Sequence, residues 1–123
     1  MAETVSFSVP LVPPSVNHYW KRRRNGGYYI SKEGETFKEF VMIEAIKGNL
    51  NVGADFYEVE AVIYLGHGQK TDVDNFGKSI LDSLVFARVI RSDAFVSDLT
   101  LRKRRDRQNP RTEITVRPST GRW

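Results

Sequence analysis

The sequence predicts an α+β fold: a small mixed β-sheet with two main helices packed on one side, and a basic hairpin near the N-terminus. Some segments alternate apolar and polar residues as strands do, and two others repeat apolar residues at helical spacing. The predicted order is strand, hairpin, helix, strand, helix, strand, strand. The 123 residues fit one domain. We expect it to span residues 1–118, with a C-terminal tail over residues 119–123.

The first predicted elements are a strand and a hairpin. Apolar and polar side chains alternate over residues 4–11, the period of a half-buried strand, and nearby prolines end it. The turn sequence Asn-Gly-Gly at 25–27 lies between aromatic residues at 19–20 and 28–29, which predicts a hairpin or flap. Aromatic residues beside basic ones can stack on nucleobases, although more often they simply pack.

Two helices are predicted. Ser31 is a suitable N-cap for a helix that runs to about Lys47 and closes at Gly48, with apolar residues at helical spacing. The helical period returns from about Asp74 to Ala87, where one face is apolar and a neighbouring stripe is charged.

Three further strands are predicted. Residues 57–65 are apolar on one face, and the other face also carries Val62 and Tyr64, so we expect this strand to be central and buried on both sides. Residues 96–105 and 112–117 are read as two more strands, joined by a polar loop at 106–110.

The basic residues are clustered. The net charge is +4, and nine of the 19 Lys and Arg residues lie in two short runs. Such clusters suit a polyanion, although two solvated loops or edges would explain them about equally well. The candidate DNA-binding residues are Lys21, Arg22, Arg23, Arg24, Lys70, Arg102, Lys103, Arg104 and Arg105.

Two carboxylates stand together in the sequence KTDVDNFGK at 70–78. In an extended segment, Asp72 and Asp74 would point to the same side and could converge on a cation. The simpler alternative makes Asp74 an N-cap and leaves Asp72 in a loop. Oxygen ligands without cysteine favour a hard ion, and Mg²⁺ usually takes one or two carboxylates together with waters and phosphate oxygens. Mn²⁺ is an alternative ion.

Other polar residues fit such a site. Lys78, one helical turn beyond Asp74, is close enough to orient a carboxylate or stabilise charge on a phosphate, or it forms a surface ion pair. Asp82 continues the stripe as a partner of Lys78 rather than a ligand. A third acid could be Asp93 or Asp98, and the spacing alone does not choose between them.

The composition excludes several classes. No apolar run approaches the roughly 18 residues needed to span a bilayer, so we expect no membrane protein. Zero cysteines exclude a disulfide framework and a thiolate metal site. The N-terminus does not have the pattern of a secretory leader, and we expect a cytoplasmic protein without an organic cofactor.

The motif D-V-D-N-F-G-K-S-I-L-D-S-L, followed by S-D-A-F-V, resembles the signature of the RusA family of Holliday junction resolvases. The N-terminal S-V-P-L-V-P-P-S-V-N-H-Y-W and S-K-E-G-E-T-F-K-E-F are also similar to that family, so the resemblance extends from about residue 5 to 116. It implies a small Mg²⁺-dependent endonuclease of bacterial or phage type that acts on four-way DNA junctions as a homodimer.

Residue by residue, the resemblance implies that Asp72, Asp74 and Asp93 are the catalytic metal-binding acids and that Lys78 is the catalytic lysine. It favours Asp93 over Asp98. The chain departs from the family in two places: it has Ser92 where many relatives have a second aspartate, and Arg88 where glycine is common.

The functional hypothesis is a Mg²⁺-dependent endonuclease that resolves Holliday junctions in recombination and repair, located at the nucleoid. One alternative is a junction-binding or architectural DNA protein without nuclease activity, which needs the basic surface but not the acids. Another is a phosphodiesterase that acts on RNA or flap DNA.

Overall fold

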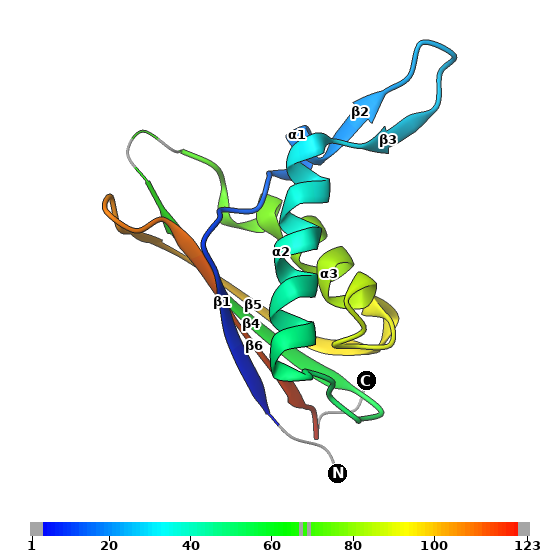
Figure 1. Cartoon of the computed structure of the whole chain (residues 1–123), viewed down its shortest axis with the longest axis vertical. Coiled ribbons are helices and arrows are strands. Elements are labelled where there is room, and N and C mark those ends of the chain that lie inside the picture. The colour runs from blue at the N-terminus through cyan, green and yellow to red at the C-terminus, as the bar shows by residue number, and fades with distance from the viewer. Residues whose placement is uncertain (1–3, 67, 69, 121–123) are drawn as a thin grey trace.

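The structure is a computed structural model and describes residues 4–66, 68 and 70–120 (Figure 1). The elements in chain order are β1 (Val5–Val9), α1 (Val16–Tyr19), β2 (Trp20–Arg22), β3 (Tyr28–Ile30), α2 (Lys32–Gly48), β4 (Tyr57–Leu65), the 3₁₀ helix η1 (Val73–Phe76), α3 (Gly77–Phe86), the 3₁₀ helix η2 (Asp93–Phe95), β5 (Val96–Arg105) and β6 (Arg111–Pro118).

The main sheet is mixed and has the strand order β1-β6-β4-β5. β4 pairs with β5 in parallel, whereas β6 pairs antiparallel with both β4 and β1. Figure 1 shows the two long helices, α2 and α3, over one face of this sheet. The predicted α+β class is therefore confirmed, and β4 is central, as expected.

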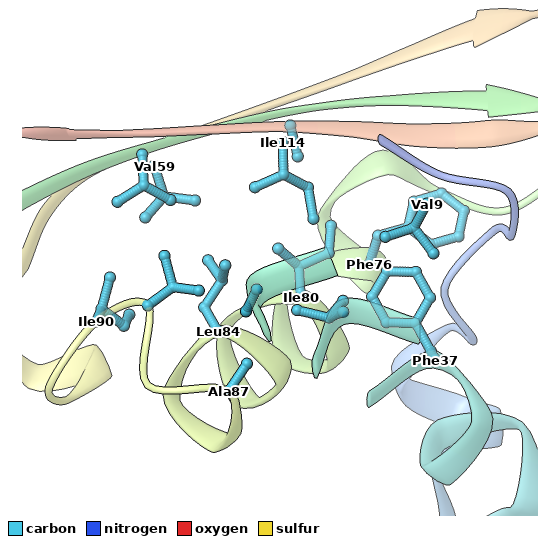
Figure 2. Close-up of a cluster of buried hydrophobic side chains, with 14 of the residues drawn as sticks. Val9, Phe37, Val59, Phe76, Ile80, Leu84, Ala87, Ile90 and Ile114 are labelled. Carbon is cyan, nitrogen blue, oxygen red and sulfur yellow. The ribbon is translucent and has the colours of Figure 1, made fainter. Parts of the chain in front are cut away.

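The core lies between that face and the helices. Figure 2 shows Val59 and Ile114 of the sheet pointing toward Ile80 and Leu84 of α3 and Phe37 of α2. All five side chains are at most 1% exposed. Strand and helix periodicity both follow from this one layer of apolar side chains.

The prediction that β4 is buried on both sides is wrong. Its residues alternate between buried and half-buried along the whole strand, and Val62 and Tyr64 belong to the half-buried set. The helices cover only the opposite face, so polar side chains of neighbouring strands share this side instead. One example is the ion pair between Arg102 and Glu60, at 2.6 Å.

The ends of α2 follow standard capping chemistry. The Ser31 hydroxyl accepts a hydrogen bond from the Gly34 amide at 3.1 Å, which confirms the predicted N-cap. Gly48 was expected to close the helix but is its last residue. Asn49 follows it with φ of 50°, the left-handed conformation that asparagine tolerates well.

The hairpin β2–β3 projects from the sheet and helices (Figure 1). The short helix α1, which the sequence did not predict, leads into it. Backbone pairing between the Ser31 amide and the Tyr19 carbonyl, at 2.8 Å, closes its base. A Cβ on Gly34 would lie 3.0 Å from the Tyr19 ring, so this glycine lets α2 pack directly against the buried tyrosine.

The end of β6 at Pro118 coincides with the expected start of the tail. Ser119 is still attached, since its amide donates to the Phe56 carbonyl at 2.8 Å. Residues 121–123 of the expected tail lie outside the described residues, and a single domain over residues 1–118 remains a prediction.

Candidate metal and DNA-binding site

The two motif acids lie where an extended segment turns into a helix. Asp72 has extended backbone, with φ of −63° and ψ of 140°, and η1 begins at the next residue. Asp74 is therefore already within the 3₁₀ turn, and the argument that two residues of an extended segment point to one side does not apply. The predicted start of the second helix near Asp74 is also three residues too early, because the α-helix begins at Gly77.

The three predicted metal ligands are exposed. Within residues 4–66, 68 and 70–120, no hydrogen bond or ion pair engages the carboxylates of Asp72, Asp74 and Asp93. Asp72 does not cap η1 through its side chain. Capping therefore explains neither motif acid, and all three carboxylates remain available to an external ligand.

The three acids do not form a ready-made metal cluster in one chain. No group of three or more Asp, Glu or His side chains among the described residues is placed to hold an ion. The Lys103 ammonium donates to the Thr71 carbonyl at 2.9 Å, which places the motif beside residue 103 of β5. Asp93 precedes Val96, at the other end of β5. Seven strand residues span about 23 Å, so residue 103 lies far along β5 from Val96, the first strand residue after η2.

The donor chemistry nevertheless suits a hard cation. Asp72 and Asp74, with only Val73 between them, carry oxygen donors, and both are exposed to solvent, from which water or phosphate oxygens could complete a coordination shell. Asp98, the rival third acid, lies in β5 and accepts a hydrogen bond from the Ser97 hydroxyl at 3.0 Å. Ser92 caps η2 by accepting from the Ala94 amide at 3.1 Å.

Lys78 lies in the first turn of α3 and is held by a chain of polar contacts. Its ammonium pairs with Asp82 at 3.3 Å, which agrees with the prediction that Asp82 is its partner. The other oxygen of Asp82 accepts a hydrogen bond from the Tyr19 hydroxyl at 2.8 Å. Burial raises the pKa of Tyr19 well above its ordinary value of 10.0, and the bond to Asp82 raises it further.

Sequence reasoning missed the contribution of Tyr19. The residue was expected only as an aromatic neighbour of the hairpin, and it lies 63 positions from Asp82. No local pattern links the two residues. The structure shows that the base of the hairpin and the lysine of the motif are parts of one polar network.

The second basic cluster is divided between the two faces of β5. Lys103 and Arg105 stand opposite Ile63 and Leu65 of β4, on the helix side of the sheet. The Arg105 guanidinium donates to the Gly66 carbonyl, at the start of the loop that leads to the motif.

Arg102 and Arg104 point to the other face, opposite Val62 and Tyr64. Arg102 is paired there with Glu60, and Arg104 donates to the Lys103 carbonyl at 2.7 Å. The sequence could not resolve this division without the strand register. Of these four residues, Lys103 contacts the motif and Arg105 contacts the start of the loop before it.

The first cluster is on the hairpin. Lys21 and Arg22 belong to β2, and Arg23 and Arg24 follow it toward the turn. All four side chains are exposed, as is Lys70 just before the motif.

No helix among the described residues is long and apolar enough to cross a membrane.

Comparison with known proteins identifies the family to which this sequence is similar. The family model described as "Endodeoxyribonuclease RusA" matches residues 10–117. The chain is 32% identical over 95 residues to a protein of Enterobacteria phage HK97 named "Crossover junction endodeoxyribonuclease rusA", which covers 76% of this chain and 77% of the relative.

Two further relatives have the same name. The protein of Enterobacteria phage 82 is 30% identical over 106 residues, covering 85% of this chain and 87% of the relative. The protein of Escherichia coli (strain K12) is 27% identical over 114 residues, covering 92% and 93%. With a family model matched over most of its length and a relative above 30% identity, this chain belongs to the RusA family of endodeoxyribonucleases.

Proposed function

We propose that this protein is a structure-selective endodeoxyribonuclease that resolves four-way DNA junctions by hydrolysing phosphodiester bonds. Membership of the RusA family carries the proposal, since curated relatives are named crossover junction endodeoxyribonucleases. The exposed carboxylates, which have no side-chain partner among the described residues, fit that chemistry, as does Lys103 beside the motif. We also propose that it acts in the bacterial cytoplasm, at the nucleoid, where a DNA substrate would be found.

Asp72, Asp74 and Asp93 are the proposed metal ligands, and Mg²⁺ or Mn²⁺ is the proposed ion. When bound, such an ion lowers the pKa of a coordinated water and neutralises phosphate charge. Lys78 would stabilise negative charge on the reacting phosphate, with its ammonium oriented by Asp82. The exposed basic side chains of the hairpin, together with Lys70 and Lys103, would hold the flanking phosphates of the DNA.

We further propose that the active form is a homodimer in which each site combines residues of two chains. Asp93 precedes the first residue of β5 whereas Thr71 contacts Lys103 near its last, and no three-ligand group forms within the described residues of one chain. A carboxylate from a second chain would remove this difficulty. Two sites related by symmetry would also suit paired cleavage of a four-way junction.

A substrate panel tests the activity. Four-way junction, flap, linear duplex and RNA substrates would be incubated with the protein in Mg²⁺ and, separately, in EDTA. We expect paired nicks in the junction that require the divalent ion. Preferential cutting of flap DNA or RNA would support the phosphodiesterase alternative instead.

Single substitutions separate the nuclease from a junction-binding protein. Asp72→Asn should abolish cleavage while junction affinity is kept or increases, because negative charge is removed beside DNA. Asp98→Asn is the matched control and should cut normally. If the wild-type protein binds junctions but does not cut them in Mg²⁺ or Mn²⁺, the architectural alternative is correct.

Mixed dimers test whether the site is shared. Asp72→Asn and Asp93→Asn chains would be inactive alone. If Asp93 acts in the partner's site, a dimer with one chain of each kind contains one intact site and should nick one strand. If all ligands come from one chain, both sites are damaged and the mixture stays inactive, which would disprove the shared site.

A further inference from the structure

The hairpin β2–β3 has two chemically different faces. Trp20 stands opposite Ile30, and Arg22 stands opposite Tyr28. Residues opposite each other in an antiparallel pair, and those two apart along a strand, share a face. These four side chains therefore line one face, whereas Lys21 and its opposite residue Tyr29 line the other.

The first face carries a pair of exposed aromatic rings. Trp20 is 40% exposed and Tyr28 is 65% exposed, both high values for large apolar side chains. The two residues line an open hollow of about 430 Å³. An aromatic hollow of this kind exposes ring surface to water unless a ligand covers it.

The tryptophan is held in place from within the molecule. Its ring packs edge to face against the buried Tyr19, with centroids 5.1 Å apart and planes at 79°. The Lys78 ammonium lies 5.9 Å from its centroid. The ring is thus anchored beside the lysine of the motif, and a ligand in the hollow would lie next to the proposed catalytic residues.

The charges around the hollow favour a polyanion. Residues 19–30 include Lys21, Arg22, Arg23 and Arg24 but no Asp or Glu. A second copy of the hairpin would bring four more like charges to the same place, which disfavours self-association through this face. A nucleic acid is complementary to both the basic side chains and the aromatic rings. Its phosphates pair with the cations, and its bases stack on the rings.

We propose that the hollow between Trp20 and Tyr28 binds an unstacked nucleobase of the branched DNA substrate. The choice of DNA rests on the function proposed above. Bases within a duplex are already stacked on both sides, whereas bases at a branch point or in a single strand have a free face. The hairpin would therefore contribute to selection of branched over linear DNA, in addition to holding phosphates.

Fluorescence gives a direct test without metal or cleavage. The sequence has two tryptophans, Trp20 and Trp123, so Trp123→Phe leaves Trp20 as the only indole. In EDTA, a single-stranded oligonucleotide should quench its emission strongly. An oligonucleotide of the same length and charge with abasic sites should bind through its phosphates but quench little. Equal quenching by both would overturn the proposal.

Binding of variants gives a second test. Trp20→Ala and Tyr28→Ala should each lower affinity for single-stranded and four-way DNA by about tenfold, while duplex affinity changes less than twofold. Trp20→Phe should restore most of the affinity, since a ring is retained. Tyr29→Ala removes an equally large exposed ring from the other face and should have little effect.

The two proposals can fail separately. If the wild-type protein does not cut junctions but both aromatic variants lose single-strand affinity, the base site holds and the nuclease assignment fails. If the wild-type protein cuts junctions while the aromatic variants bind all DNA forms as it does, the base site is refuted. If circular dichroism shows that Trp20→Ala is misfolded, the affinity of Tyr28→Ala and the quenching assay still test the base-binding site.

Discussion

Removal of one buried hydroxyl tests the link between the hairpin and the motif. In Tyr19→Phe, the ring that packs against Gly34 and Trp20 is kept, and only the bond from the hydroxyl to Asp82 is lost. Tyr19 has an exposed fraction of 0% and the bond is 2.8 Å long. The substitution therefore isolates one hydrogen bond to a charged group.

Hydrogen bonds to charged groups contribute about 1.5–3 kcal/mol. The lower end applies, because the Asp82 side chain is 22% exposed and water can replace the lost donor. We expect the free energy of unfolding to fall by about 1.5 kcal/mol. With a urea m-value of about 1.5 kcal/mol/M, the unfolding midpoint should fall by about 1 M.

The loss should depend on pH. The pKa of Tyr19 is raised in the folded protein, so its contribution is complete below the ordinary value of 10.0 and decreases as pH rises above it. The difference between wild type and Tyr19→Phe should therefore be constant from pH 7 to 9 and shrink at higher pH. Lysine titration occurs in both proteins and cancels in the difference.

Urea unfolding followed by circular dichroism would measure these values, and Tyr29→Phe is the control because its hydroxyl is on the exposed hairpin. The control should change the free energy by less than about 0.5 kcal/mol. Equal stability of Tyr19→Phe and wild type would refute the energetic role of this bond. So would an equal loss in the control.

Three further predictions follow from other contacts. Lys103→Ala should reduce the salt dependence of junction binding by about one unit of slope, whereas Arg102→Ala, on the other face of β5, should not; titrations at several salt concentrations would show this. Arg88 has φ of 61°, so Arg88→Gly should stabilise the protein by about 0.5–1 kcal/mol in urea unfolding, and a loss would contradict the strain argument. Arg111 lowers the pKa of Asp106, whose contribution is present above the ordinary value of 3.8 and is lost as pH falls below it; Arg111→Gln should therefore flatten the acid part of the stability curve measured by thermal unfolding.

Periodic elements could be predicted well from the sequence. The bounds of β4 and β5 agree with the expected ranges, and in β4 buried and half-buried residues alternate over all nine positions. The helix α2 begins at its predicted cap because Ser31 supplies a local hydrogen bond. These features depend on neighbours along the chain, which a sequence displays directly.

Other features depend on distant neighbours or on few residues. The four-residue helix α1 is too short to show a helical period. Asp72 and Asp74 are both suitable residues for the start of a helix, so the sequence did not fix where the second helix begins. In the structure a 3₁₀ turn, η1, comes before α3. The bond between Tyr19 and Asp82 and the faces of β5 both require tertiary register, which no local pattern contains.

The arrangement of the metal ligands was not accessible to sequence reasoning for another reason. Like charges repel unless a cation lies between them, so an ion contributes to their final positions. A second chain adds a further contribution if the site is shared. Convergence of Asp72, Asp74 and Asp93 thus remains a prediction, to be tested with the assembled, ion-loaded protein.

The position of β5 has a consequence for solubility. It is the last strand of the sheet order, and among the described residues no other strand pairs with its outer side. Open edges invite strand addition by other molecules and hence aggregation, and lysine and arginine on an edge are a common protection. Its run of basic residues at 102–105 supplies that protection. Neutralising all four together to weaken DNA binding would risk fibrous precipitates, so single substitutions are the safer design.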